Sequence, residues 1–240
     1  MRKSWEVASI AICAGLYAVV GYMSYLGLFT PVIGVVRFWP SVFIPAVFAV
    51  LLGPRVGGIG AAIGIFISDM MIHGNALLSL SVGVPANFVG FYLVGCIARR
   101  LKSGGLKWVL ATLGEEAVVL LLVLLATYTG ILSMSVAVAY TIGICVALAF
   151  TLAYGTAIRD HSGQLLAYST GLLAGSIIIG IGVYAFSQLF ILPGGYSRLP
   201  LEAALLWTLW TYATEIPFMV ALSPPVVAVA GKVLPKVNED

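Results

Sequence analysis

The sequence contains very little charge for its length. Only 9% of its 240 residues are Asp, Glu, Lys or Arg, while 61% are hydrophobic; a soluble domain carries about 25% charged residues. No polar stretch is long enough to form a soluble domain, so an ATPase, kinase or receiver activity would have to come from another chain. The composition predicts an all-α integral membrane protein, with a single transmembrane domain over residues 1–240 in contact with lipid.

Residue types that carry catalysis and metal binding are also scarce. The three cysteines, Cys13, Cys96 and Cys145, lie inside apolar runs, and we expect small buried side chains rather than disulfides or metal ligands. The sequence lacks an H-E-x-x-H pattern, a phosphate-binding glycine-rich loop and a nucleophile elbow. We therefore expect no enzymatic activity, no metal site, no cofactor and no nucleic-acid partner.

Apolar runs long enough to cross a bilayer recur along the whole sequence. The second and third runs are short, but the Gly53-Pro54 turn between them leaves no room for another connection. We therefore expect a bundle of about eight transmembrane helices, with six or seven as the alternative. The expected spans are 7–28, 37–52, 56–72, 78–98, 108–131, 135–158, 165–191 and 201–229.

The positions of the basic residues predict the orientation, because cytoplasmic loops carry an excess of Lys and Arg. With eight spans and both termini inside, the inner side holds ten of the 12 basic residues. Arg198 falls in an outer loop, and Arg37 lies near the outer end of the second span. The inner set is Arg2, Lys3, Arg55, Arg99, Arg100, Lys102, Lys107, Arg159, Lys232 and Lys236.

The stretch 36–69 reads as two short apolar helices joined by a tight turn. Arg37 opens the stretch and Asp69 closes it, each about 14–16 residues from the turn, or about 21–24 Å along a helix. Both charges should lie at the outer face, where ionisable groups are costly unless they are paired or functional. They form either an ion pair that fixes the hairpin or one wall of an outward-facing ligand pocket. The same outer level holds Trp39, His73, Asn75, Tyr196 and Arg198.

The last span combines aromatic residues with a carboxylate at membrane depth. Trp207 and Trp210 lie on one helical stripe, and Glu215 lies on another, about 15 residues from the outer end. Pro217 removes one helical hydrogen bond and frees the carbonyl of Ala213. This pattern suits a pocket wall for a polar ligand that contains a ring. The alternative is an interfacial aromatic belt together with a carboxylate that is paired elsewhere.

Three further polar residues interrupt the apolar runs. Asn87 in the fourth span is a candidate for a second wall of the pocket. Glu115 and Glu116 lie in the inner half of the fifth span, where we expect them to pair with basic residues near the inner face. The expected partners are Arg99, Arg100 and Lys107.

Small residues recur four positions apart in the first span. Ala14 and Ala18 form one pair, and Ala11 and Gly15 form a second pair on an adjoining stripe. Small residues at this spacing let two helix backbones approach closely, either within one chain or between partners. The third span carries a comparable series: Gly57, Gly60 and Gly64.

Three blocks of the sequence resemble the substrate-binding (S) subunits of energy-coupling factor transporters. They are ICAGLYAVVGY with Ala14-x-x-x-Ala18, VRFWPSVFIPAVFAVLLGPRVGGIGAAIGIFISD, and EIPFMVALSPPVVAVAGKVLP. The second block is similar to the family's order of arginine, aromatic residue, proline, apolar helix, Gly-Pro turn, glycine-rich helix and acidic residue. The blocks cover roughly a third of the sequence. The family typically has six spans, fewer than the eight expected here.

The resemblance implies a subunit in a prokaryotic cell membrane that captures a vitamin or related micronutrient at an outward-facing pocket. It also implies docking onto a transmembrane coupling subunit powered by cytoplasmic ATPases, with Ala14 and Ala18 as the docking surface. In the pocket, aromatic rings would stack on a heterocycle, and Glu215 would pair with a cationic or N–H-rich group. The expected substrate-binding residues are Glu215, Trp207, Trp210, Asn87, Asp69 and Arg37.

Two other functions stay open on the sequence. The first is a carrier that works alone and is driven by ions or protons, for which Asp69, Glu115 and Glu215 are the titratable candidates. The second is a membrane sensory or assembly module.

Overall fold

The computed structural model describes residues 3–33, 36–101, 104–157 and 162–233. The structure is 84% helical with almost no sheet, which confirms the expected all-α class. The helices are α1 (Lys3–Tyr25), η1 (Pro40–Val42), α2 (Phe43–Leu52), α3 (Pro54–Ile72), α4 (Ala76–Leu78), η2 (Ser79–Gly83), α5 (Val84–Arg100), α6 (Leu106–Tyr128), α7 (Met134–Ala157), α8 (Ser162–Leu189) and α9 (Glu202–Val233). The two short strands are β1 (Val32–Ile33) and β2 (Val36–Arg37), which pair antiparallel.

Seven helices in the described ranges are long and apolar enough to cross a membrane, and α4, η2 and α5 together count as one of them. The expected span 37–52 is instead a shorter apolar helix, Pro40–Leu52, preceded by extended chain. Two prolines explain the difference. Pro40 keeps Trp39 extended (φ −119°, ψ 81°), and Pro45 is tolerated only because it falls in the first turn of α2.

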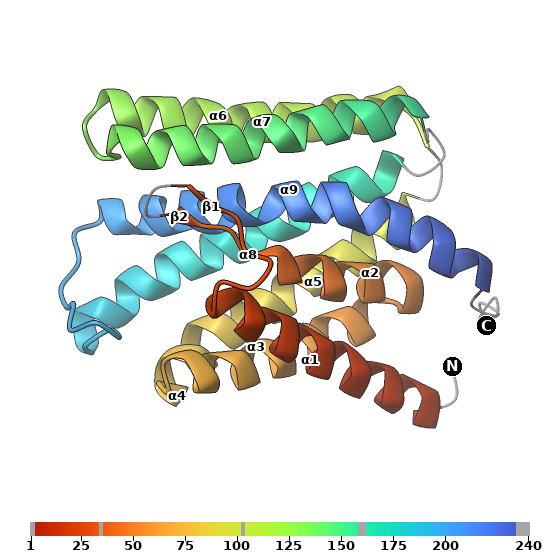
Figure 1. The fold of residues 1–240 in the computed structure, drawn as a ribbon, viewed down its shortest axis with the longest axis horizontal. Coiled ribbons are helices and arrows are strands. Elements are labelled where there is room, and N and C mark those ends of the chain that lie inside the picture. The colour runs from red at the N-terminus through yellow and green to blue at the C-terminus, as the bar shows by residue number, and fades with distance from the viewer. Residues whose placement is uncertain (1–2, 34–35, 102–103, 158–161, 234–240) are drawn as a thin grey trace.

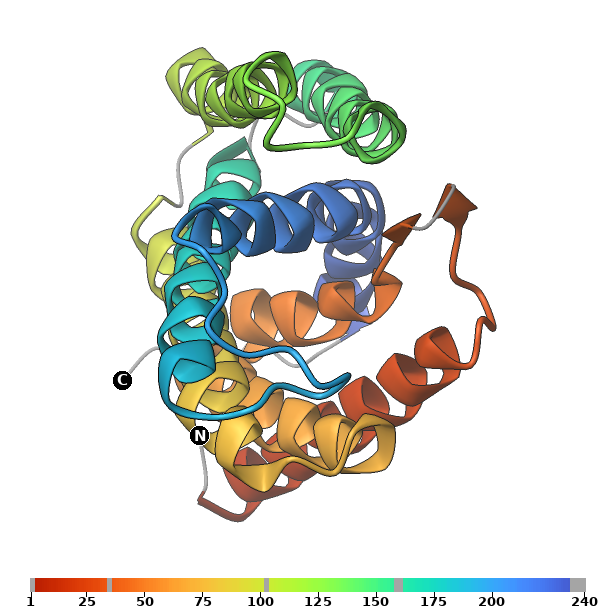
Figure 2. The same cartoon turned by 90° about the vertical axis from the view of Figure 1, so that its left-hand side faces the viewer.

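The helices are arranged in layers (Figures 1 and 2). The α6–α7 hairpin lies on one side of the molecule and packs on α8 and α9. Helices α1 and α3 pack together on the opposite side, and α2 and α5 lie between them and the α8–α9 layer. The start of α1 and the end of α9 lie at the same end of the bundle (Figure 1).

Charge differs between the two ends of the bundle. The end that holds the starts of α1, α3 and α6 and the ends of α5 and α9 is called here the basic end (Figure 1). Its described basic residues are Lys3, Arg55, Arg99, Arg100, Lys107 and Lys232. The opposite end, with the β1–β2 hairpin, α4 and the α8–α9 connection, is called the cavity end (Figure 1).

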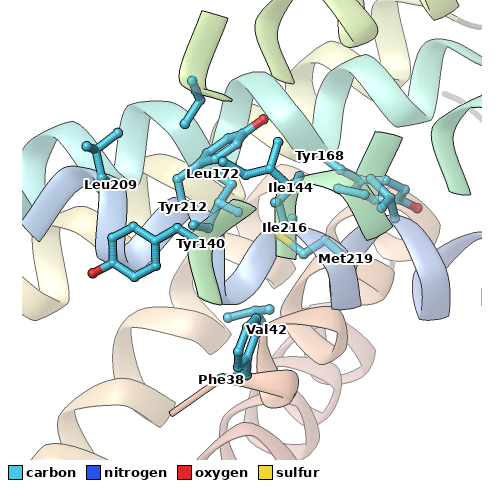
Figure 3. Close-up of a cluster of buried hydrophobic side chains, with 14 of the residues drawn as sticks. Phe38, Val42, Tyr140, Ile144, Tyr168, Leu172, Leu209, Tyr212, Ile216 and Met219 are labelled. Carbon is cyan, nitrogen blue, oxygen red and sulfur yellow. The ribbon is translucent and has the colours of Figure 1, made fainter. Parts of the chain in front are cut away.

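The largest buried cluster lies where α7, α8 and α9 meet the segment that follows β2 (Figure 3). Phe38 and Val42 contact this cluster from one side of α9, while the Tyr212 side chain points to the other side (Figure 3). The Tyr212 hydroxyl is 2.7 Å from Oγ of Ser169 on α8. This cluster joins the extended segment to the C-terminal helices.

The small-residue stripe of α1 packs inside the chain. Ala14 and Ala18 are each only 3% exposed, and α1 packs on α3. A Cβ atom placed on Gly64 of α3 would lie 2.9 Å from the carbonyl oxygen of Ala14 and 3.0 Å from the Tyr17 side chain. The stripe therefore serves packing within the chain, and in this conformation it is not open to a docking partner. The docking role that the resemblance implied for Ala14 and Ala18 stays a prediction.

We expect the substitution Gly64→Ala to lower the thermal stability of the purified protein in detergent. The added methyl group would press on the α1 backbone, and overpacking of this kind typically costs about 1–3 kcal/mol. Gly15→Ala is the matched control, because a Cβ atom there meets nothing within 4 Å. Both substitutions favour the helix equally, so equal melting temperatures for the two variants would contradict the close contact between α1 and α3.

Candidate functional site

A cavity of about 770 Å³ lies at the cavity end, between α1, α3, α5, α8 and α9. Its volume is within the roughly 300–1,000 Å³ typical of small-molecule sites. All six residues expected from the sequence line it: Arg37, Asp69, Asn87, Trp207, Trp210 and Glu215. The α8–α9 connection also contributes to the lining, and Figure 2 shows this connection running across the end of the bundle.

Asp69 is held in place by a short polar cluster at the end of α3. Its Oδ2 accepts a hydrogen bond of 2.6 Å from Oγ of Ser79, and its Oδ1 lies 3.6 Å from Nε2 of His73. Ser79 begins η2, a π-helical turn whose Gly83 also lines the cavity. Such turns are frequent at functional sites because they redirect side chains within a helix. Asp69 therefore presents a fixed carboxylate to the cavity.

Arg37 does not pair with Asp69. Nη1 of Arg37 donates to the carbonyl of Tyr25, at the C-terminal end of α1, over 2.9 Å. Among the described residues, the basic side chain within 4 Å of the Asp69 carboxylate is that of His73, which is charged only when it is protonated. The Arg37–Asp69 ion pair, one of the two alternatives from the sequence, is therefore not formed. Both side chains line the cavity separately.

Tyr17 and Asn87 join α1 to α5 at the cavity wall. The Tyr17 hydroxyl donates to Oδ1 of Asn87 over 2.9 Å, and Nδ2 of Asn87 donates to the carbonyl of Gly83 over 3.0 Å. These two bonds fix the orientation of the Asn87 amide. The Tyr17 hydroxyl also interacts electrostatically with Glu215 and Asp69, so these four polar groups share one region of the cavity.

Glu215 differs from Asp69 because its carboxylate has no hydrogen-bond or ion-pair partner in the part of the chain that the structure describes. The Trp207 and Trp210 rings precede it on α9, with ring centroids 6.2 Å apart. Trp210 also meets Tyr140 edge to face at 6.2 Å. A carboxylate that lines a cavity together with aromatic rings and has no partner among the described residues is well placed to accept hydrogen bonds from a ligand.

The carbonyl freed by Pro217 does not serve the cavity. A Cβ atom on Gly143 of α7 would overlap the carbonyl oxygen of Ala213, so this oxygen is covered by α7. The neighbouring carbonyl, that of Thr214, accepts a hydrogen bond of 3.2 Å from the backbone N–H of Trp39. The expectation that the Ala213 carbonyl is exposed beside the ligand is therefore wrong.

Several lining residues were not expected from the sequence, including Tyr17, Tyr25 and the glycines of α8. A Cβ atom on Gly171 would lie 2.8 Å from the carbonyl oxygen of Gly90, so α5 and α8 nearly touch at this wall. The four-residue spacing of Gly171 and Gly175 signals such a contact. No comparable signal separates Tyr17 from an ordinary packing residue.

The glutamates of α6 lie outside the cavity lining. Glu116 accepts a hydrogen bond from Thr151 over 2.8 Å, and Glu115 accepts one from Thr170 over 2.7 Å. No ion pair links either glutamate to a basic residue within the described ranges. The expected pairing with basic residues near the inner face is therefore replaced by hydroxyl donors from neighbouring helices.

The fold and the cavity together define a multi-pass α-helical membrane protein with a site of small-molecule size at one end of its bundle. The sequence matches no protein-family model, no curated protein and no solved structure at a significant level. The function is therefore inferred from the site itself.

We expect Tyr17→Phe to lower the melting temperature of the purified protein, because it leaves Oδ1 of Asn87 without its donor. The loss of such a hydrogen bond costs about 1 kcal/mol, and more where the acceptor is buried. Tyr22→Phe on the same helix is the control, because the Tyr22 hydroxyl has no hydrogen-bond partner among the residues described. If both variants melt at the wild-type temperature, the Tyr17–Asn87 bond does not hold this wall.

Proposed function

We propose that the protein is a membrane-embedded binding subunit for the uptake of a vitamin or related micronutrient. It captures the substrate in the cavity and moves it across the membrane together with a coupling subunit and ATPases supplied by other chains. The single observation that carries this proposal is the Glu215 carboxylate, which has no partner among the described residues and lines a cavity of about 770 Å³ together with Trp207 and Trp210. The sequence resemblance to S subunits supports the same function.

The lining favours a polar ligand that contains a ring and carries a cationic or N–H-rich group. Tryptophan and tyrosine side chains offer flat surfaces on which a heterocycle can stack. Asp69 and Glu215 contribute two carboxylates, against one guanidinium from Arg37. Because Asp69 already accepts a bond from Ser79, Glu215 is the carboxylate that receives the ligand.

Under this proposal the basic end lies in the cytoplasm and the cavity faces outward, as the distribution of Lys and Arg favours. The segment 36–52 then makes the eighth crossing as extended chain followed by η1 and α2. Its residues reach about 34 Å, enough for a hydrocarbon core of about 30 Å. An even number of crossings agrees with the start of α1 and the end of α9 lying at one end of the bundle (Figure 1).

A second candidate is a carrier that works alone and is driven by an ion gradient. The observation that favours it is the pair of glutamates on α6, which have no basic partner among the described residues. Uptake into proteoliposomes that contain this chain alone, driven by a proton or sodium gradient without ATP, would support this candidate. Uptake that requires ATP and partner subunits would support the binding subunit.

We expect Glu215→Gln and Trp210→Ala each to weaken ligand binding at least tenfold, which corresponds to about 1.4 kcal/mol. The ligand is first identified by mass spectrometry of the small molecules that co-purify with the wild-type protein, and its affinity is then measured by calorimetry. Glu202→Gln and Trp5→Ala are the matched controls, because both residues lie outside the cavity lining. Full affinity in either cavity variant would overturn the pocket assignment.

A further inference from the structure

A second polar cluster lies where α6 faces α7, α8 and α9. Glu116 of α6 is fully buried. Its Oε1 accepts the hydrogen bond from Thr151 of α7, whereas its Oε2 is buried and has no partner among the described residues. Native proteins rarely leave a buried carboxylate oxygen unsatisfied, so this atom calls for an explanation.

The Glu115 carboxylate also has one bonded and one unbonded oxygen, but its hydrogen bond goes to a different helix. Its Oε1 accepts the hydrogen bond from Thr170 of α8, and its Oε2 is also buried without a partner in the described ranges. Ser169 precedes Thr170 on α8, and its hydroxyl is hydrogen-bonded to the Tyr212 hydroxyl of α9 over 2.7 Å. In Figure 3 the Tyr212 side chain points away from Phe38 and Val42. The two carboxylates are therefore bonded by hydroxyl groups of α7 and α8, and the Ser169–Tyr212 hydroxyl pair follows next to Thr170.

The depth of this cluster makes two bare negative charges costly. Glu116 lies 10 residues after the start of α6 at Leu106, which places it about 15 Å along the helix and near the middle of a hydrocarbon core of about 30 Å. Charges at this depth are paired or take part in transport. Within the described residues, no basic side chain forms an ion pair with Glu115 or Glu116, so no positive charge in this part of the chain neutralises the cluster.

We propose that Glu115 and Glu116 form a binding site for a small monovalent cation, either a sodium ion or a proton. Carboxylate and hydroxyl oxygens are hard ligands that suit a sodium ion. The two Oε2 atoms would contact it directly, and the hydroxyl groups of Thr151 and Thr170 already bond the two carboxylates. A transition metal is not expected, because no group of three or more His, Cys, Asp or Glu side chains occurs in the described part of the chain.

The proposed cation site and the cavity lie on opposite faces of α8 and α9. Thr170 of α8 is followed directly by Gly171 and Leu172, which line the cavity. On α9, Tyr212 lies between Thr211 and Thr214, which line the cavity as well. Occupation of the cation site therefore acts on the same two helices that hold the ligand. The proposal goes beyond the proposed function, because the site needs neither the cavity nor its ligand.

The test uses the full-length protein, purified without ligand in detergent, with binding of radioactive ²²Na⁺ and the melting temperature as readouts. If the cation is sodium, we expect saturable ²²Na⁺ binding and a rise in melting temperature of about 5 °C or more in sodium chloride over choline chloride. If the cation is a proton, we expect no ²²Na⁺ binding, but a melting temperature in choline chloride that changes with pH through these two glutamates.

Glu115→Gln and Glu116→Gln are expected to abolish whichever response the wild-type protein shows, and Thr170→Val is expected to weaken it. Glu6→Gln and Glu202→Gln are controls on other helices and should keep the full response. Glu215→Gln should also keep it, so a failure of this proposal is distinguishable from a failure of the proposed ligand site. The absence of ²²Na⁺ binding, together with the same pH dependence in wild type and both glutamine variants, would overturn the cation site.

Discussion

The extended segment between β2 and α2 has to satisfy its backbone inside the protein, because lipid offers no hydrogen bonds. The N–H of Phe38 donates to the carbonyl of Pro31, and the N–H of Trp39 donates to the carbonyl of Thr214 on α9. These bonds bring Arg37 and Trp39 to the part of α9 that carries Glu215. This enclosed segment therefore joins the N-terminal part of the cavity wall to α9, in addition to the direct packing of α5 on α8.

The cavity follows from that arrangement, because its polar groups come from segments far apart in the sequence. Asp69 arrives from the end of α3, Asn87 from α5, and Glu215 from the middle of α9. The hydrogen bonds of Asp69 and Asn87 to residues around η2 hold two of these groups in fixed positions. Of these three polar side chains, only Glu215 has no hydrogen-bond partner within the described residues. The proposed function depends on this free carboxylate.

The sequence was sufficient for the class of fold and for six of the residues that line the cavity. Long apolar runs predict spanning helices directly, and charges at similar distances from a tight turn predict a common end of the bundle. In the structure, Arg37, Asp69 and Glu215 line the same cavity. Their contacts were not predictable, because Arg37 bonds a backbone carbonyl that no sequence pattern marks.

Two further features depend on tertiary packing, which the sequence pattern alone does not predict. Ala14–Ala18 and Ala11–Gly15 have the same spacing, but only the first pair is buried against the rest of the chain. Helical spacing identifies a close contact without telling which helix makes it. Likewise, Glu115 and Glu116 were expected to pair with nearby charges, whereas the fold gives them hydroxyl groups from α7 and α8.

The two polar sites lie on opposite faces of the same pair of helices. The cavity uses one face of α8 and α9, and the glutamates of α6 meet the other face. The proposed ligand and the proposed cation would therefore be held by the same two helices.

The central claim is that the cavity holds a small molecule through Glu215 and its neighbouring tryptophans. The most direct measurement is an experimental structure of the protein purified from its native membrane under conditions that retain bound small molecules. We predict density for a ring-containing molecule in the cavity, within hydrogen-bond distance of the Glu215 carboxylate and against the Trp210 ring. A cavity that contains only water or lipid chains, with the native ligand bound elsewhere on the protein, would contradict it.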